Sequence, residues 1–315
     1  MRIGVDVGGT NLVAGLVNDK FELIDKVDTP ALATRPDTEL VADIIMLCKK
    51  LMEKHNLTEN DVESIGVGIP GCCDDEKGVV LHCTNINFHN TPMVSMIQKE
   101  INVPVYLGND ADCAALGEAY AGATKGVDKS IMVTIGTGIG GGIIINKKIY
   151  NGFNFCGGEI GHMVIVQGGE ECGCGRKGCW EAYGSATALI KQTKAAIETN
   201  PDSKLAKMVD GDLSMVNGKT AFDAMRAGCP VGKTVVDKYV EYFSSGITNI
   251  INILQPEKIV IGGGVSKEGK PLIDAIMKHV SAERYGEKND LPKTTIHTAV
   301  LGNDAGVIGA AALGI

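Results

Sequence analysis

Four side chains in one short segment have the types and the spacing of a metal site. His162 is followed by Cys172, Cys174 and Cys179 in the pattern H-x9-C-x-C-x4-C. One imidazole and three thiolates complete the tetrahedral ligand set of structural zinc and leave no open position for a water nucleophile. The alternatives are a cysteine-rich surface loop or a redox pair. We expect a structural zinc ion here, so any catalysis requires other residues.

The neighbouring glycines and the remaining cysteines agree with this assignment. Gly173, Gly175 and Gly178 suit a short loop wrapped round an ion, because glycine tolerates backbone conformations that a Cβ atom forbids. The other seven cysteines are scattered, and each is interpreted as a small buried apolar residue. These seven are Cys48, Cys72, Cys73, Cys83, Cys113, Cys156 and Cys229.

Two segments of the chain repeat one pattern. Residues 3–20, IGVDVGGTNLVAGLVNDK, superimpose without a gap on residues 131–148, IMVTIGTGIGGGIIINKK. Each segment consists of an apolar strand, a glycine-rich turn and a second apolar strand. Two such hairpins predict two domains of related topology.

The glycine turns of these hairpins are candidates for phosphate binding. Gly136, Gly138 and Gly141 have G-x-G-x-x-G spacing, but a dinucleotide fingerprint opens a helix and this turn continues as a β-branched strand. Backbone N–H groups of such a hairpin can still hold phosphate oxygens. A tight turn is the alternative. Thr10 and Thr137, one in each turn, favour a pair of phosphate-binding loops.

An aspartate precedes the first glycine turn. Asp6 lies between the strand residues Val5 and Val7, where its carboxylate could engage a phosphate-bound magnesium ion directly or through water. The alternative is an aspartate on an edge strand that points to solvent.

A second aspartate lies at a predicted strand-to-helix junction. The strand 103–107 breaks at Gly108, and a helix begins near Asn109. The helix N-terminus favours the ionised form of Asp110, and an ionised carboxylate can accept the proton of an attacking hydroxyl in phosphoryl transfer. Helix capping is the alternative, and it suits Asn109 as well as Asp110. The residues alone do not decide between these roles.

Composition limits the class of protein. A chain of 315 residues exceeds the usual size of a single core, which predicts two domains. The formal net charge of -8 and the lack of a basic cluster argue against nucleic-acid binding. No apolar run approaches the roughly 20 residues of a membrane span, and the N-terminal residues do not form a signal peptide. We therefore expect a cytoplasmic protein without a nucleic-acid or membrane partner.

Taken together, the motifs resemble a known family. The segments are VDVGGTN, GIPG, TNIN, GNDADCAALGE, GGEIGHM, CGCGRKGCWEAYGS and IVIGGGVS. In this order, along nearly the whole chain, they resemble the ROK family of sugar kinases and repressors, and its glucokinases more closely. The resemblance implies an α/β actin-like ATPase (ribonuclease H-like) fold with two domains around a nucleotide and sugar cleft. The small domain would comprise residues 1–118 and 301–315, and the large domain residues 119–300 with a zinc-binding loop at 162–179.

The same resemblance implies the roles of the site residues. Asp110 resembles the general base that deprotonates the 6-hydroxyl of a hexose. The residues that would bind the sugar are Asn109, Asp110, Glu159, His162, Glu181, Gly71 and Asn85. Those that would bind ATP and its Mg²⁺ are Asp6, Gly8, Gly9, Thr10, Thr137, Gly138, Gly262, Gly263 and Gly264. The zinc ion would hold Glu159 and Glu181 in place, while His162 binds zinc through one ring nitrogen and a sugar hydroxyl through the other.

The expected function is therefore that of an ATP-dependent glucokinase. The alternative is a kinase of the same family for fructose, mannose or N-acetylmannosamine. A sugar-sensing repressor would need an N-terminal helix-turn-helix domain and a basic face. Because this sequence starts at the first predicted phosphate strand and is acidic, we do not expect a repressor. Polyphosphate or ADP could replace ATP as the donor. Phe88 stands where many relatives carry tryptophan, so the residues at the rim of the sugar site are not assigned from the resemblance. The family implies a homodimer, with a homotetramer as the alternative.

Overall fold

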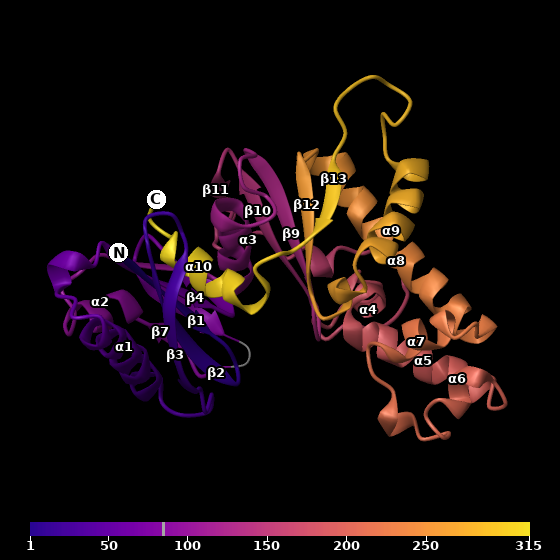
Figure 1. The fold of residues 1–315 in the computed structure, drawn as a ribbon, viewed down its shortest axis with the longest axis horizontal. Coiled ribbons are helices and arrows are strands. Elements are labelled where there is room, and N and C mark those ends of the chain that lie inside the picture. The colour runs from indigo at the N-terminus through magenta and orange to yellow at the C-terminus, as the bar shows by residue number, and fades with distance from the viewer. Residues whose placement is uncertain (84–85) are drawn as a thin grey trace. The chain divides into compact units, whose positions relative to one another are not determined.

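The computed structural model describes residues 1–83 and 86–315, and its contacts divide the chain into two compact units (Figure 1). The first unit comprises Met1–Met132, Gly141–Gly158 and Ala299–Ile315, and the second comprises Val133–Gly140 and Glu159–Thr298. The predicted division after residue 118 therefore differs from the observed contacts. Met132 and Ile144 pack in one apolar cluster with Leu116 and Leu313, which places residues 119–132 and 141–158 with the first unit.

A five-stranded sheet with the order β3-β2-β1-β4-β8 forms the centre of the first unit. Strand β1 pairs antiparallel with β2 and parallel with β4, and β4 pairs parallel with β8. Ile3 and Val5 on one face of β1 and Gly4 on the other are buried, as expected for a strand covered on both faces. The strands are β1 (Arg2–Val7), β2 (Asn11–Val17), β3 (Leu23–Pro30), β4 (Ser64–Ile69) and β8 (Val105–Asn109).

The C-terminal helix completes this sheet although it lies far away in the sequence. Figure 1 shows α10 (Ala305–Ala311) against β1 and β4, and α10 also contacts α3 (Asp110–Ala121). Glycines allow the close approach. A Cβ atom on Gly66 of β4 would lie 1.7 Å from the carbonyl oxygen of Ala310, and one on Gly309 would lie 1.6 Å from that of Cys113. Neither position can accept a side chain without movement of the backbone.

The first unit also contains a small sheet and further helices. The order of the small sheet is β5-β6-β7, with both pairs antiparallel. Its strands are β5 (Gly71–Asp74), β6 (Val79–Cys83) and β7 (His89–Thr91). The helical segments are α1 (Asp37–Lys54), η1 (Glu59–Asp61), α2 (Met93–Gln98) and η5 (Gly302–Asp304).

The second sheet repeats the topology of the first. Its order is β11-β10-β9-β12-β13, in which the repeated hairpin β9–β10 takes the places of β1–β2. The division into units passes through β9 and β10. The internal repeat of the sequence thus corresponds to two sheets of one design. The strands are β9 (Lys129–Ile135), β10 (Ile139–Ile145), β11 (Lys148–Ile149), β12 (Lys258–Gly263) and β13 (Thr295–Thr298).

Helices make up most of the rest of the second unit. The long helix α8 (Pro230–Leu254) buries Tyr239 and Phe243, and the ring of Phe243 contacts Trp180 at a centroid distance of 5.1 Å. The others are η2 (Ile160–His162), α4 (Glu181–Gly184), α5 (Ala186–Thr199), α6 (Lys204–Lys207), η3 (Leu213–Met215), α7 (Thr220–Arg226), η4 (Val265–Glu268) and α9 (Lys270–Glu283). Within the described residues, no helix has the length and apolarity that a membrane span requires.

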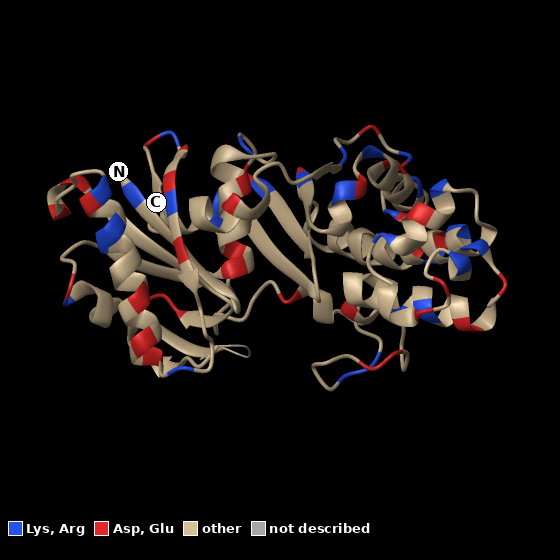
Figure 2. Cartoon of the chain, turned by 60° about the horizontal axis from the view of Figure 1, so that its bottom comes forward, with Lys and Arg blue, Asp and Glu red and all other residues tan. Residues whose placement is uncertain are grey.

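Acidic and basic residues are mixed along the elements of both units. Figure 2 shows lysine and arginine interspersed with aspartate and glutamate on the helices and loops. Many of the pairs are local, such as Lys233 with Asp237 on α8 and Lys270 with Asp274 on α9. Such exposed pairs contribute little to stability, in the range of about 0–1 kcal/mol each.

Candidate functional site

The junction of β8 and α3 gives Asn109 and Asp110 different tasks. Asn109 is the N-cap of α3, and its Oδ1 accepts hydrogen bonds from the N–H groups of Ala111 at 2.8 Å and Asp112 at 3.4 Å. Its Nδ2 donates to the carbonyl oxygen of Gly71 at 3.1 Å. Asn109 therefore caps the helix, and its contact with Gly71 places that glycine beside the junction.

Asp110 is the first residue of α3 and is half-buried. Its Oδ1 accepts a hydrogen bond from the N–H of Ala111 at 2.9 Å. Burial raises the pKa of Asp110 above its ordinary value, and hydrogen bonds from backbone N–H groups oppose this shift. A carboxylate with a raised pKa is a stronger base in its ionised form, which suits proton abstraction from an alcohol.

Asp6 lies on the central strand of its sheet and not on an edge. Its cross-strand partners are Val13 on β2 and Gly68 on β4. Burial, and secondarily the negative charge of Asp110, raise the pKa of Asp6 to about 6. The two carboxylates therefore repel each other within one unit, an arrangement that a cation would relieve.

The first glycine turn follows directly after Asp6. The N–H of Gly8 donates to the carbonyl oxygen of Asn11 at 2.9 Å, and the carbonyl oxygen of Thr10 accepts from Ala31 at 2.8 Å. Gly9 and Thr10 are exposed, and a Cβ atom on Gly9 would meet no atom within 4 Å. The turn thus presents an open stretch of backbone at the end of β1.

The predicted metal ligands come together in the second unit. One ligand atom from each of His162, Cys172, Cys174 and Cys179 lies within 4.8 Å of all the others. Cys172 Sγ lies 3.6 Å from His162 Nδ1, and Cys174 Sγ lies 3.7 Å from Cys179 Sγ. A tetrahedral ion with Zn–S of about 2.3 Å and Zn–N of about 2.0 Å requires separations of about 3.6 to 3.8 Å. The four residues therefore fit a zinc ion.

Backbone geometry explains why glycines occur in this loop. Gly175 and Gly178 have φ angles of 85° and 83°, in the left-handed region that glycine adopts readily. A Cβ atom on Gly178 would also lie 1.8 Å from the carbonyl oxygen of Val166. The expected need for backbone freedom holds for these two positions, whereas Gly173 has neither a left-handed φ nor a close neighbour.

Two glutamates flank the metal ligands. His162 Nδ1 is directed to Cys172, while its Nε2 lies 3.9 Å from Glu159 Oε2. Glu181 Oε1 lies 3.6 Å from Cys172 Sγ, and Glu181 Oε2 accepts a hydrogen bond from the N–H of Ile139 at 3.0 Å. Glu181 thus links the metal segment to the second glycine turn. Sequence reasoning missed this link, because no local signal relates residues so far apart.

The second glycine turn lies next to the third glycine segment. A Cβ atom on Gly138 would lie 2.1 Å from Glu181 Oε2. Gly263 has a φ of 89°, and its Cβ would lie 2.1 Å from the carbonyl oxygen of Ile135. That oxygen also accepts a hydrogen bond from the N–H of Gly264 at 3.2 Å. The segment Gly262–Gly264 is therefore in contact with Ile135 at the end of β9, two residues before Thr137.

The predicted site residues are divided between the two units. The first unit holds Asp6, Gly8, Gly9, Thr10, Gly71, Asn109 and Asp110. The second unit holds Thr137, Gly138, Glu159, His162, Cys172, Cys174, Cys179, Glu181, Gly262, Gly263 and Gly264. Asn85, predicted as a sugar ligand, lies outside the described residues.

The class of the fold follows from three features. The two sheets share one topology, each sheet contains a hairpin with a glycine turn, and a carboxylate precedes the first turn. This class is the actin-like ATPase fold, which solved sugar kinases share. The model of the ROK family matches residues 2–315, and the chain belongs to this family.

Relatives of known name cover nearly the whole chain. The glucokinase of Halalkalibacterium halodurans is 36% identical over 308 residues, which are 98% of this chain and 92% of that protein. A solved structure of a ROK family glucokinase from Streptomyces griseus contains glucose and AMPPNP. Its sequence is 33% identical, its TM-score is 0.80, and the match covers 99% of this chain and 98% of the glucokinase chain. The ROK hexokinase from Thermus thermophilus is 28% identical with a TM-score of 0.82. The match covers 98% of this chain and 96% of the hexokinase chain.

Proposed function

We propose that this protein is a glucokinase that transfers the γ-phosphoryl group of ATP to the 6-hydroxyl of glucose. Similarity to glucokinases over nearly the full length supports this assignment, including a relative whose structure contains glucose and AMPPNP. The observation that carries the chemistry is the junction at the start of α3. Asn109 caps the helix there, and the carboxylate of Asp110 remains available with a raised pKa.

In this proposal Asp110 is the general base. It accepts the proton of the 6-hydroxyl as the hydroxyl oxygen attacks the γ-phosphorus in line with the leaving ADP oxygen. The raised pKa increases its basicity in the ionised state, and general base catalysis of this kind contributes about 10² to 10⁴ in rate.

Asp6 and the glycine segments would serve the nucleotide. Asp6 would hold the phosphate-bound Mg²⁺ directly or through water, which supplies charge neutralisation for the phosphates. Gly9 and Thr10 are exposed in the first turn, directly after Gly8, which supports a role of this turn in phosphate binding, and Thr137 with Gly138 would act in the same way. Gly262–Gly264 would lie against adenosine.

Recognition of the sugar rests on polar side chains directed at its hydroxyls. The ligands we propose are Asn109, Asp110, Glu159, His162 and Glu181, together with Gly71 and Asn85. Buried polar partners reject an analogue that lacks a hydroxyl, because the partner then stays unpaired. The arrangement of His162 supports its double role. Nδ1 is directed to the thiolates, and Nε2, near Glu159, is left for a hydroxyl.

A structural zinc ion would hold these ligands in place. The distances between the sulfur and nitrogen atoms support zinc at His162, Cys172, Cys174 and Cys179. With four protein ligands the ion has no open position, so it would stabilise the loop and take no part in the reaction. The contact of Glu181 with both Cys172 and the Ile139 backbone supports coupling between zinc and the sugar ligands.

The test is a coupled ADP-release assay with magnesium ATP and a panel of glucose, mannose, fructose, N-acetylglucosamine and N-acetylmannosamine. We expect glucose to have the highest kcat/KM. If another sugar has it, the specificity is wrong and the chain is a kinase for that hexose or amino sugar. If no sugar is phosphorylated, ATP is the wrong donor or the chain is not a kinase, and polyphosphate and ADP distinguish these cases.

The variant that tests the base is Asp110→Asn. We expect kcat to fall by about 10² to 10⁴, because the lost function acts in the transition state. Glucose binding, measured by calorimetry, should be retained. Asp128→Asn changes an exposed carboxylate that pairs with Lys147; it is the matched control and should keep wild-type kcat. Unchanged turnover of Asp110→Asn would remove this residue from the mechanism.

Assembly and location complete the proposal. We expect a homodimer, as is common in the family, with a homotetramer as the alternative, and light scattering after size-exclusion chromatography distinguishes them. The three thiolates of the zinc set support a reducing compartment, the cytoplasm, because thiols persist there. Small molecules, the sugar and ATP, are the proposed partners.

A further inference from the structure

The loop of residues 31–36, which connects β3 to α1, contacts the first glycine turn. The N–H of Ala31 donates to the carbonyl oxygen of Thr10 at 2.8 Å. Ala31 is fully buried, whereas Thr10 is exposed. The loop therefore holds the buried side of the turn and leaves its other side open to a ligand.

The backbone of this loop is strained at an exposed residue. Leu32 has a φ of 45°, in the left-handed region that residues other than glycine rarely adopt. Its side chain is 62% exposed, so burial of its apolar surface does not hold it there. Such a conformation persists only where the surrounding contacts determine it. Other residues must therefore fix the loop at Leu32.

Arg35 makes the contacts that fix it. The N–H of Arg35 donates to the carbonyl oxygen of Leu32 at 3.1 Å, and Arg35 Nη2 donates to that of Ala31 at 2.9 Å. The carbonyl groups on both sides of the strained residue are thus held by one arginine. Nη2 also donates to Oδ2 of Asp43 on α1 at 2.5 Å, which anchors the guanidinium to a helix.

A second segment holds the far end of the loop. The N–H of Asn87 donates to the carbonyl oxygen of Ala33 at 3.0 Å, and Asn87 Nδ2 donates to that of Arg35 at 3.1 Å. Ile86 and Phe88, on either side of Asn87, are buried in the core of the first unit. These contacts use only the backbone of the loop, so they remain when the Arg35 side chain is replaced.

We propose that Arg35 is a positioning residue for the phosphate groups of the nucleotide, which rests on the phosphate-binding role proposed for the first glycine turn. Arg35 acts through Ala31. Its guanidinium holds the Ala31 carbonyl group, and the N–H of Ala31 holds the carbonyl group of Thr10. A turn that is ordered before the ligand arrives loses less conformational entropy on binding. Arg35 thereby increases nucleotide affinity through the backbone of the turn.

The experiment is a calorimetric titration of the full chain with AMPPNP and Mg²⁺ at pH 7.5, without sugar. We expect Arg35→Ala to weaken AMPPNP binding about fivefold, the order of effect of one lost hydrogen bond. Arg35→Lys should bind more tightly than Arg35→Ala, because its ammonium group can still donate to the Ala31 carbonyl group. Arg2→Ala is the matched control. It removes ion pairs with Asp19 and Glu63 at the end of β1 opposite the turn, and AMPPNP affinity should not change.

The unfolding midpoint without nucleotide shows whether each variant folds. Wild-type AMPPNP affinity in folded Arg35→Ala would overturn the proposal, as would equal weakening in Arg2→Ala, which would indicate general destabilisation. Arg35→Lys that binds no more tightly than Arg35→Ala would contradict the hydrogen bond to Ala31. If Arg35→Ala does not fold, Asp43→Asn removes only the anchor of the guanidinium, and unchanged affinity in this variant would then refute the role of Arg35.

The same titration separates this proposal from the proposed function. A wild-type protein that does not bind AMPPNP would overturn the nucleotide site and the role of Arg35 together. A wild-type protein that binds AMPPNP but does not phosphorylate glucose would overturn the glucokinase assignment alone, and the comparison of the arginine variants would still stand.

Discussion

The raised pKa of Asp6 predicts that the charge of this residue is costly to the folded protein. Asp6 lies on the central strand β1, where burial and the negative charge of Asp110 raise its pKa from 3.8 to about 6. Replacing it by asparagine removes the charge with little change of shape. We expect Asp6→Asn to stabilise the protein at neutral pH and, if Asp6 holds the phosphate-bound Mg²⁺, to lower kinase activity.

The size of the effect follows from the shift in pKa. One unit of pKa corresponds to about 1.36 kcal/mol, so a shift from 3.8 to about 6 costs the folded state about 3 kcal/mol at pH 7.5. The penalty arises as pH rises above the unfolded-state pKa and is complete above the folded-state pKa. At pH 5.0 the folded-state carboxyl is mostly protonated, and the same two pKa values give about 1.6 kcal/mol. The advantage of Asp6→Asn should therefore shrink by about half between pH 7.5 and 5.0.

The assay is urea unfolding of wild type and Asp6→Asn, without Mg²⁺ and nucleotide, at several values of pH from 7.5 to 5.0. The difference in the free energy of unfolding between the two proteins is the quantity of interest, because loss of zinc at lower pH affects both. Asp61→Asn is the control. Hydrogen bonds from Thr58 lower the pKa of Asp61, so both its folded-state and unfolded-state values lie below pH 5 and its difference should stay constant. A constant difference for Asp6→Asn would refute the raised pKa.

Three further predictions concern the zinc loop, the third glycine segment and the pH dependence of the reaction. Cys174→Ser should lose zinc and glucose affinity together, since metal binding and loop folding are linked, as measured by elemental analysis and by the fluorescence of Trp180, the only tryptophan; a zinc-free wild type with full activity would contradict this. Gly263→Ala should lower the free energy of unfolding by about 1 to 3 kcal/mol, because its φ of 89° and the oxygen 2.1 Å from its Cβ position both oppose a side chain; an unchanged unfolding midpoint would show that this backbone relaxes freely. The kcat/KM should decrease on the acid side as Asp110 takes up a proton, at a pH above its ordinary pKa of 3.8; a pH–rate profile that stays level down to pH 4 is inconsistent with this base.

Much of the architecture follows from local sequence patterns. The hairpin repeated at 3–20 and 131–148 predicts two domains of related topology, and the structure contains two sheets with corresponding strand orders. The boundary between the two units was harder to predict from sequence patterns. Residues 119–132 and 141–158 belong with the first unit, because their apolar side chains pack against α3 and α10. Which surface an apolar strand covers depends on elements distant in sequence.

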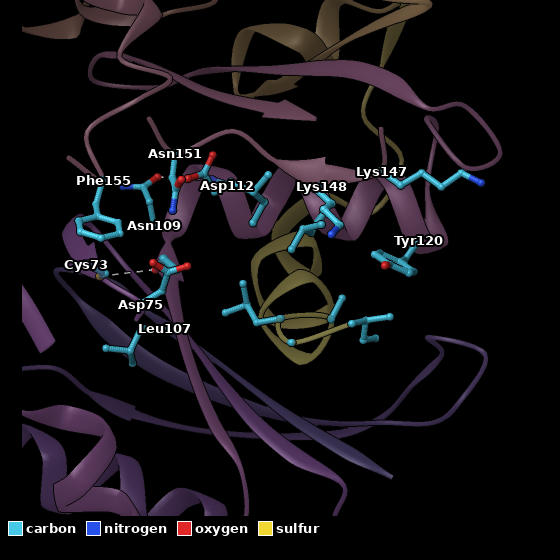
Figure 3. A pocket seen from close by; sticks show the side chains of 17 residues that line it. Cys73, Asp75, Leu107, Asn109, Asp112, Tyr120, Lys147, Lys148, Asn151 and Phe155 are labelled. Atoms are coloured by element: carbon cyan, nitrogen blue, oxygen red, sulfur yellow. Dashed lines mark hydrogen bonds between the residues drawn. The ribbon is translucent and has the colours of Figure 1, made fainter. Parts of the chain in front are cut away.

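A cavity in the first unit illustrates the same limit. Figure 3 shows side chains around a cavity of about 290 Å³, with Asp75, Asn109 and Asn151 among those that line it. Asp75 had no assigned role in the sequence, and Asn151 carried no motif. Residues from β8, from the segment after β11 and from the C-terminus meet here only because the chain returns to the first unit.

The sequence by itself determined the features that depend on residue type and short spacing. These are the cluster of potential metal ligands between His162 and Cys179, the glycine turns, and the placing of Asn109 and Asp110 at a junction of strand and helix. Local chemistry suffices for them, because ligands within one loop need no distant partner to be recognised.

Only the tertiary structure decided which residues contact each other and which of two adjacent residues caps the helix. Asn109 caps the helix, and the negative charge of Asp110 contributes to the raised pKa of Asp6. Glu181 accepts a hydrogen bond from the backbone of Ile139, and His82 is the cross-strand partner of His89. Strand register and helix packing set these contacts. Both arise from the burial of apolar surface by the whole chain, a global quantity that no short segment contains.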